Sequence, residues 1–216
     1  MCPVPKVQRT AHAGRRPRSD GEANRELLLA SAALVIRQEG AGVPMATIAA
    51  HAGLGIGTLY RHYSSREALL AALTHRSFRL VLASAQRAAA ADQVAIECVR
   101  LFLDDTIRHG AELVLPMHGG PVPIDQPTLD LRTEVHGTLE KILRRGRLDG
   151  TIRSNVTALD LIVFGAMIAQ PLPTASNWKR TAKRQSAIFL DGLAATTAES
   201  LKHKRGPSNS QSISIH

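Results

Sequence analysis

The sequence predicts an all-α fold in which a small N-terminal unit of three helices precedes a larger helical unit. Apolar residues recur three and four positions apart along most of the 216-residue chain, which is the spacing of helices with one buried face. Three glycines at alternate positions, Gly53, Gly55 and Gly57, follow a short stretch that has this spacing and no β-branched run of strand length. The glycines therefore mark a turn between two short helices.

The N-terminal unit is predicted to cover residues 24–70, after a basic arm, residues 1–23, that is expected to be disordered. Its first helix is expected to begin at Asn24, because asparagine is a favourable N-cap residue, and to end at Gly40. A second helix is expected over about residues 44–52.

The stretch GTLYRHY, after the glycines, predicts a third helix. Ser64 then predicts the start of a fourth, because Ser64 and Glu67 have the spacing of a capping box. Its apolar positions continue through Leu82, so this helix is long enough to join the two units.

The larger unit is predicted to cover residues 71–203 and to be followed by a disordered tail, residues 204–216. A cluster of prolines and glycines after Gly110 interrupts the helical pattern, and a loop or a broken helix is expected there. The expected elements are helices over about 91–109, 129–147, 157–169 and 177–201, with the irregular segment over 112–128.

The glycine-rich stretch has two interpretations. A dinucleotide-binding loop needs a preceding strand and G-x-G-x-x-G spacing, and a P-loop needs a following Gly-Lys-Ser/Thr; the sequence has neither. Three short helices with a turn between the second and third instead predict a helix-turn-helix, which places its second helix in the major groove of double-stranded DNA.

Charge and composition agree with this interpretation. Residues 1–66 carry nine Lys and Arg against four Asp and Glu, within a net charge of +9 for the chain. Such a block attracts polyanions, although a merely solvated basic tail explains the charge equally well. Two cysteines, no apolar run of membrane-spanning length and no secretory signal predict a cytoplasmic protein without a membrane partner.

The stretch TIAAHAGLGIGTLYRHYSSREAL resembles the DNA-binding motif of the TetR family of bacterial transcriptional regulators. Hydrophobic, small, aromatic and basic positions agree from Ile48 to Leu69. Small residues at Gly55 and Gly57 let the start of the third helix approach DNA. The residues expected to face base edges are Ile56, Thr58 and Arg61, with Arg61 suited to guanine.

The resemblance implies that Tyr60, His62 and Arg66 hold phosphates, and Thr47 stands near the position where many relatives have a hydroxyl. A core role for Tyr60 and an ordinary surface role for His62 remain open alternatives. In the basic arm, Arg16 and Arg18 are expected to contact DNA, by counterion release or in the minor groove.

The resemblance also implies an effector pocket and a dimer interface in the larger unit. The expected effector is a small, largely apolar molecule, with Phe102, Met117, His118, His136 and Phe164 as candidate contacts. The expected homodimer interface uses Leu161, Gly165, Ala166 and Ala169, although a buried helix within one chain would explain the same residues.

The sequence therefore predicts a dimeric, ligand-responsive regulator, most simply a repressor of an inverted-repeat operator. A helical small-molecule carrier or an enzyme with an incidental basic face remains the alternative, and a non-specific nucleoid protein would lack the apolar second unit. No nucleophile–base pair, metal motif or cofactor motif is present in the sequence, so we expect no catalytic residues, metal or cofactor.

Overall fold

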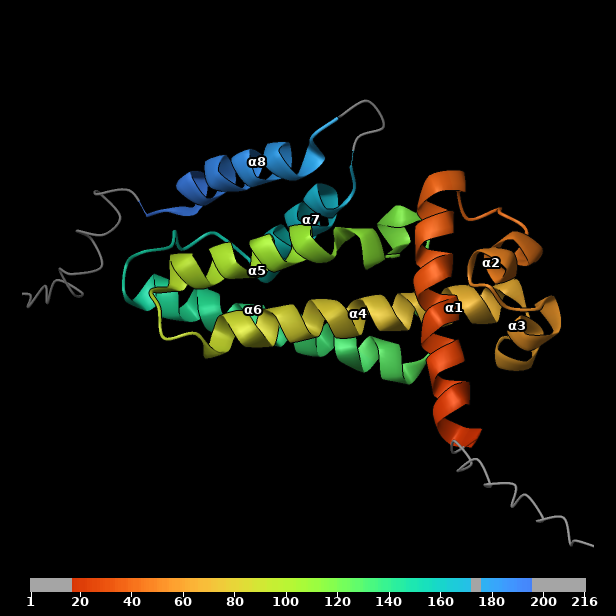
Figure 1. Ribbon diagram of the computed structural model, residues 1–216. Helices are drawn as coiled ribbons and strands as arrows, with labels where there is room; N and C mark the ends of the chain where they lie inside the picture. Colours follow the sequence, from red (N-terminus) through yellow and green to blue (C-terminus); the bar gives the residue numbers. More distant parts are fainter. Residues whose placement is uncertain (1–16, 172–175, 196–216) are drawn as a thin grey trace, which may run out of the picture.

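The computed structural model describes residues 17–171 and 176–195, and these residues are helical with one isolated β-bridge (Figure 1). The helices are α1 (Pro17–Glu39), α2 (Met45–His51), α3 (Ile56–His62), α4 (Arg66–Ala90), α5 (Ala95–His109), α6 (Gln126–Leu148), α7 (Ala158–Ala169) and α8 (Trp178–Leu193). Two 3-10 turns, η1 (Gly110–Glu112) and η2 (Pro116–His118), follow α5; η2 lies within the segment that is expected to be irregular, and η1 ends at its first residue.

Two hydrophobic cores divide the described helices into two units, which confirms the all-α architecture. Residues of α1, α2, α3 and the start of α4 form the first core, and residues of α4 to α8 form the second. Leu69 and Leu73 of α4 belong to the first core, whereas Leu82 and Ala85 of the same helix belong to the second. Helix α4 therefore connects the two cores as one continuous rod, as Figure 1 shows.

Helix α1 begins seven residues before the predicted N-cap at Asn24. It starts at Pro17, so residues 17–23 are helical and do not belong to a disordered arm. Proline suits the first turn of a helix, because its fixed φ is helical and its missing N–H would have no partner there. Gly21 lies in an open position within this helix, where it costs about 1 kcal/mol relative to alanine and does not end the helix.

The N-cap of α4 is Ser65, and the predicted capping box from Ser64 is wrong by one residue. The Ser65 hydroxyl oxygen accepts a hydrogen bond from the backbone N–H of Ala68 at 3.2 Å. Glu67 is instead bonded to its own backbone N–H and to the Ser65 hydroxyl, and these bonds lower the pKa of its carboxyl. Two adjacent serines offered the same cap, and the extended backbone at Ser65 decides which one is used.

Helix α8 ends at Leu193, earlier than the predicted end at Leu201. The next residue, Ala194, pairs with Ile152 in an antiparallel β-bridge, so the backbone has left the helix there. Residues 196–201 of the predicted helix lie outside the described residues.

Candidate DNA-binding site and ligand cavity

A tight turn joins α2 to α3. Gly53 has φ of +66°, the left-handed conformation that glycine adopts without strain, as predicted from the sequence. The N–H of Gly53 donates to the carbonyl of Ala50 at 3.0 Å, and the N–H of Leu54 donates to the carbonyl of Ala49 at 2.9 Å. These bonds end α2 and set the direction in which α3 leaves.

Helix α3 has one buried and one exposed face. Leu59 is completely buried and packs in the first core, and Tyr63 is buried in the same core. Ile56 and Tyr60 are 42% and 49% exposed, although both are large and apolar or aromatic. Tyr60 is therefore not a core residue. Both side chains are therefore accessible to a partner of α3.

Gly55 and Gly57 lie at the N-terminal end of α3 in open space. A Cβ atom built at either position would meet no atom of the protein within 4 Å, and neither residue has a positive φ. Packing and backbone conformation therefore do not require glycine here. A close approach by another molecule to the N-terminal end of α3 does explain these small residues.

Arg61 is exposed and lies along the surface of α3. Its Nε donates to the carbonyl of Gly57 at 3.3 Å, and its Nη2 donates to Thr58 Oγ1 at 3.1 Å. These bonds orient the guanidinium beside Ile56 and Thr58 while leaving further N–H donors unused. The arrangement can present a fork of donors to a base edge.

Tyr63 and Arg25 connect α3 to α1, a contact that the sequence reasoning missed. The Arg25 guanidinium lies 5.7 Å from the centre of the Tyr63 ring, within the range of a cation–π contact. Burial is the main reason that the pKa of Tyr63 lies above its ordinary value. The phenol is therefore a neutral core group.

The larger unit contains a cavity of about 220 Å³ between α4, α5, α6 and α7. Its walls are predominantly apolar, and Thr106, Arg132 and His136 are the polar residues among them. The lining residues are Phe78, Val81, Phe102, Thr106, Leu113, Leu115, Pro116, Arg132, Val135, His136, Leu159, Ile162, Gly165 and Ala166. This composition is typical of a small-molecule site.

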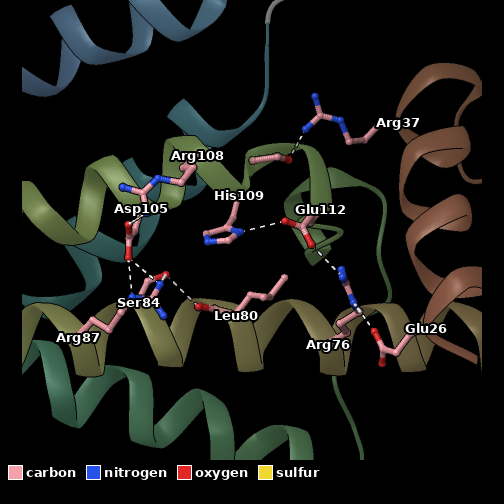
Figure 2. Close-up of polar contacts among 11 residues, drawn as sticks. Glu26, Arg37, Arg76, Leu80, Ser84, Arg87, Asp105, Arg108, His109 and Glu112 are labelled. Carbon is pink, nitrogen blue, oxygen red and sulfur yellow. Dashed lines mark hydrogen bonds and ion pairs between the residues drawn. The ribbon is translucent and has the colours of Figure 1, made fainter. Parts of the chain in front are cut away.

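A polar junction lies between the cavity and the N-terminal unit (Figure 2). Arg76 of α4 donates to Glu26 of α1 at 3.3 Å and to Glu112 of η1 at 2.8 Å. The bond between Glu112 and His109, at 2.9 Å, is the main cause that lowers the pKa of the Glu112 carboxyl, and the bond from Arg76 adds to it. Arg37 of α1 donates to the carbonyl oxygen of Gly110, also in η1.

Comparisons with known proteins identify the N-terminal unit. Residues 28–73 match the family described as bacterial regulatory proteins, tetR family. The chain belongs to the tetR family. It is therefore a DNA-binding transcriptional regulator, with α2 and α3 as its helix-turn-helix.

Solved structures of tetR-family regulators share the fold over both units. A TetR transcription regulatory protein from Mycobacterium vanbaalenii is 25% identical, with a TM-score of 0.58 over 82% of this chain and 99% of that one. A TetR transcriptional regulator from Streptomyces coelicolor is 28% identical, with a TM-score of 0.54 over 80% of this chain and 99% of that one.

A third solved structure, AibR in complex with isovaleryl coenzyme A and operator DNA, is 18% identical. Its TM-score is 0.61 over 79% of this chain and 98% of that one, and this likeness concerns the fold. No curated protein matches the chain in sequence.

The other residues predicted to contact DNA, beyond those on the exposed face of α3, are bonded within the fold, half-buried or outside the described residues. Arg66 donates from Nη1 to the carbonyl of Ala41 at 2.7 Å, so it holds α4 against the loop between α1 and α2. His62 and Thr47 are half-buried. Arg16 and the side chain of Arg18 lie outside the described residues.

The structure brings two of the five predicted effector contacts, Phe102 and His136, into the cavity lining. His118 lies outside the lining, where its Nε2 is 2.9 Å from the carbonyl oxygen of Ala166. Phe164 stacks on Phe189 of α8, with ring centres 3.8 Å apart, and does not line the cavity. The side chain of Met117 lies outside the described residues.

The four residues predicted at the dimer interface are buried within the chain, which supports the alternative interpretation of a buried helix within one chain. Gly165 packs against Phe102 and Thr106 of α5, and the other three, Leu161, Ala166 and Ala169, are at most 5% exposed. Helix α7 is apolar nearly all round, and the sequence could not show which side faces α5. Its exposed apolar residues are Leu159, Val163 and Met167, and Ile188 is exposed on α8.

Within the described ranges, no group of His, Cys, Asp or Glu side chains could hold a metal ion. None of the helices in these ranges combines the length and the apolar character that crossing a membrane requires.

Proposed function

We propose that this tetR-family chain is a homodimeric repressor that binds an inverted-repeat operator and releases it when a small molecule enters the cavity. The observation that carries the proposal is the exposed face of α3. Ile56, Tyr60 and Arg61 are exposed there, and nothing in the fold explains why they should be.

In this proposal the contacts divide into two kinds. Arg61, Ile56 and Thr58 read base edges from the N-terminal half of α3, because a guanidinium can bind guanine with two hydrogen bonds. Tyr60 and His62 hold phosphates and set the register of the helix without reading sequence. Arg66 acts through its bond to Ala41, which fixes the reading helices relative to α1.

A dimer would supply a second copy of α3, the helix that we assign to reading base edges and call the reading helix. One helix reads too few base pairs to select a site, and two are held about 34 Å apart on one face of DNA by a two-fold axis. The exposed apolar residues Leu159, Val163 and Met167 of α7, together with Ile188 of α8, are the surface that we assign to the partner. Apolar side chains so concentrated are typical of an interface.

The polar junction supports a mechanism for release. Leu113 lines the cavity, and the adjacent Glu112 is bonded to Arg76, which also holds Glu26 of α1. A ligand that moves this wall would therefore disturb the contacts that orient α1 and α4. The ligand lowers DNA affinity only if it binds more tightly to the conformation in which the two α3 helices of the dimer no longer match the spacing of the major groove.

The test begins with selection of operator sequences from random duplexes. Binding of the selected operator is then compared for the unmodified chain and for Arg61→Ala. We expect the variant to lose about 1 to 3 kcal/mol of discrimination at one base pair of each half-site. Arg79→Ala is the control, because Arg79 is exposed on α4 and not on α3. Unchanged sequence preference in Arg61→Ala would remove Arg61 from the base-reading set.

Reciprocity tests the release step. A compound that lowers operator affinity tenfold, about 1.4 kcal/mol, must bind about tenfold more weakly to the DNA-bound protein. Calorimetric titration with and without operator measures both affinities. Equal affinity in the two states would show that the compound binds without regulating.

A further inference from the structure

The edge of the cavity carries two cationic or protonatable side chains from one face of α6. Arg132, Val135 and His136 stand at positions i, i+3 and i+4, so they point to the same side of the helix. Val135 is buried in the cavity wall, whereas Arg132 and His136 are exposed. All three line the cavity. The two polar side chains therefore stand at its mouth.

The rest of the lining offers a ligand little polar contact. Thr106 is buried, and its hydroxyl already donates to the carbonyl of Phe102 at 2.8 Å within its own helix. The other lining residues are aliphatic, aromatic, glycine or proline. A ligand with a polar group can satisfy that group only at the mouth, where Arg132 and His136 lie.

Arg132 and His136 have no hydrogen-bond or ion-pair partner among the described residues. Several other arginines of this unit do have partners, since Arg87 donates to Asp105 at 2.6 Å and Arg147 donates to Glu140 at 2.7 Å. Exposed arginines away from the cavity, such as Arg144, have none among the described residues, so the distinction of Arg132 is its place in the cavity lining. None of the lining residues is acidic. The mouth of an apolar cavity thus carries a positive charge that the protein does not neutralise.

We propose that the cavity binds an amphipathic anion whose apolar body fills the interior and whose carboxylate lies at the mouth, paired with Arg132 and hydrogen-bonded to His136. This inference rests on the proposed function only in taking the cavity as the effector site. An engineered apolar cavity of about 150 Å³ holds benzene, so the cavity of about 220 Å³ has room for a body of roughly six to ten carbon atoms. Guanidinium and carboxylate match as a two-bond pair.

The test compares acids with their neutral amides on the full chain. Hexanoate, octanoate and 4-phenylbutanoate are titrated by calorimetry beside hexanamide, octanamide and 4-phenylbutanamide. Each pair has nearly the same shape and differs in charge. We expect at least one acid to bind about fivefold to thirtyfold more tightly than its amide, which is the range for a hydrogen-bonded charge pair. The ratio should fall as salt is added, because the mouth is exposed.

Arg132→Met removes the charge while keeping an apolar stem. We expect it to weaken binding of the preferred acid by about tenfold and to change amide binding by less than about twofold. Arg144→Met is the matched control, because Arg144 is an exposed arginine of α6 that does not line the cavity. It should leave both affinities unchanged. The acid–amide comparison on the unmodified chain remains a complete test if Arg132→Met fails to fold.

Amides that bind as tightly as the acids, or no binding by any acid, would overturn the inference. These outcomes are separate from the proposed function. Neutral amides that bind and release the operator would leave the repressor mechanism in place and remove the role of Arg132. Acids that bind in an Arg132-dependent way without affecting the operator would support the anion site and overturn ligand-induced release.

Discussion

The contact between η1 and the end of α7 leaves no room for a side chain at Gly110, and Gly110→Ala tests this packing. A Cβ atom at Gly110 would lie 2.4 Å from the carbonyl oxygen of Ala169 and 3.2 Å from its carbonyl carbon. The backbone of Gly110 has φ −50° and ψ −32°, a right-handed helical conformation that alanine adopts readily. The expected cost is therefore steric, without backbone strain at the substituted residue.

The size of the effect follows from these distances. The atom in the way is backbone, so it cannot turn aside like the end of a flexible side chain, and η1 or α7 must move by about 1 Å to restore an ordinary contact. Such overpacking costs about 1 to 3 kcal/mol. Alanine also restricts the unfolded chain, which offsets about 0.4 to 1 kcal/mol. We expect the free energy of unfolding to fall by about 1 to 2 kcal/mol.

Gly137→Ala is the matched control. Gly137 lies inside α6, and a Cβ atom there would meet nothing within 4 Å. The same substitution should stabilise the protein by about 0.5 to 1 kcal/mol, because glycine is unfavourable inside a helix. Urea unfolding followed by far-ultraviolet circular dichroism measures both variants. All samples need one protein concentration, since the stability of a dimer depends on it.

A Gly110→Ala variant that is at least as stable as the unmodified protein and binds the operator with unchanged affinity would refute the close packing of η1 on α7. A stable variant with an altered operator affinity would be a different result. It would show that the displacement is absorbed at the Arg37 contact to Gly110, and that this contact influences the reading helices.

Three other predictions concern the interface, the junction and DNA. Met167→Glu should give monomers by sedimentation with unchanged helix content, because Met167 is 59% exposed, whereas Ala166→Arg should unfold the larger unit, because Ala166 is buried. Glu112→Gln should cost about 0.5 to 1 kcal/mol of unfolding free energy at pH 7. The pKa of Glu112 is lowered in the folded protein, so its contribution exists above the ordinary carboxyl pKa and is lost as the pH falls through the lowered one. The difference between variant and unmodified protein should therefore vanish in acid unfolding curves. Tyr60→Phe should weaken binding to operator and random duplex by the same factor, about fivefold in anisotropy titrations; a loss confined to the operator would make Tyr60 a base-reading residue.

The helix-turn-helix could be predicted from the sequence because local chemistry determines it. Gly53 provides the left-handed residue that the turn requires, as its φ of +66° confirms. Helical spacing places Leu59 and Tyr60 about 100° apart around α3, and the structure shows that Leu59 is the buried one. Cap positions were less certain, since Ser64 and Ser65 are chemically equivalent and differ only in the backbone conformation that the preceding turn imposes.

The sequence by itself determined the all-α fold, the reading helix and the long helix that joins the two units, because each depends on residues close together in the chain. Only the tertiary structure decided which sides of α7 face inward, since a helix that is apolar nearly all round has no periodicity to indicate its buried face. The same holds for the bond of Arg66 to Ala41 and for the unpaired Arg132 at the cavity mouth. Packing brings together hydrogen-bonding residues that lie far apart in the sequence. Whether a charged side chain lacks an ion-pair partner can be judged only when its neighbours in space are known.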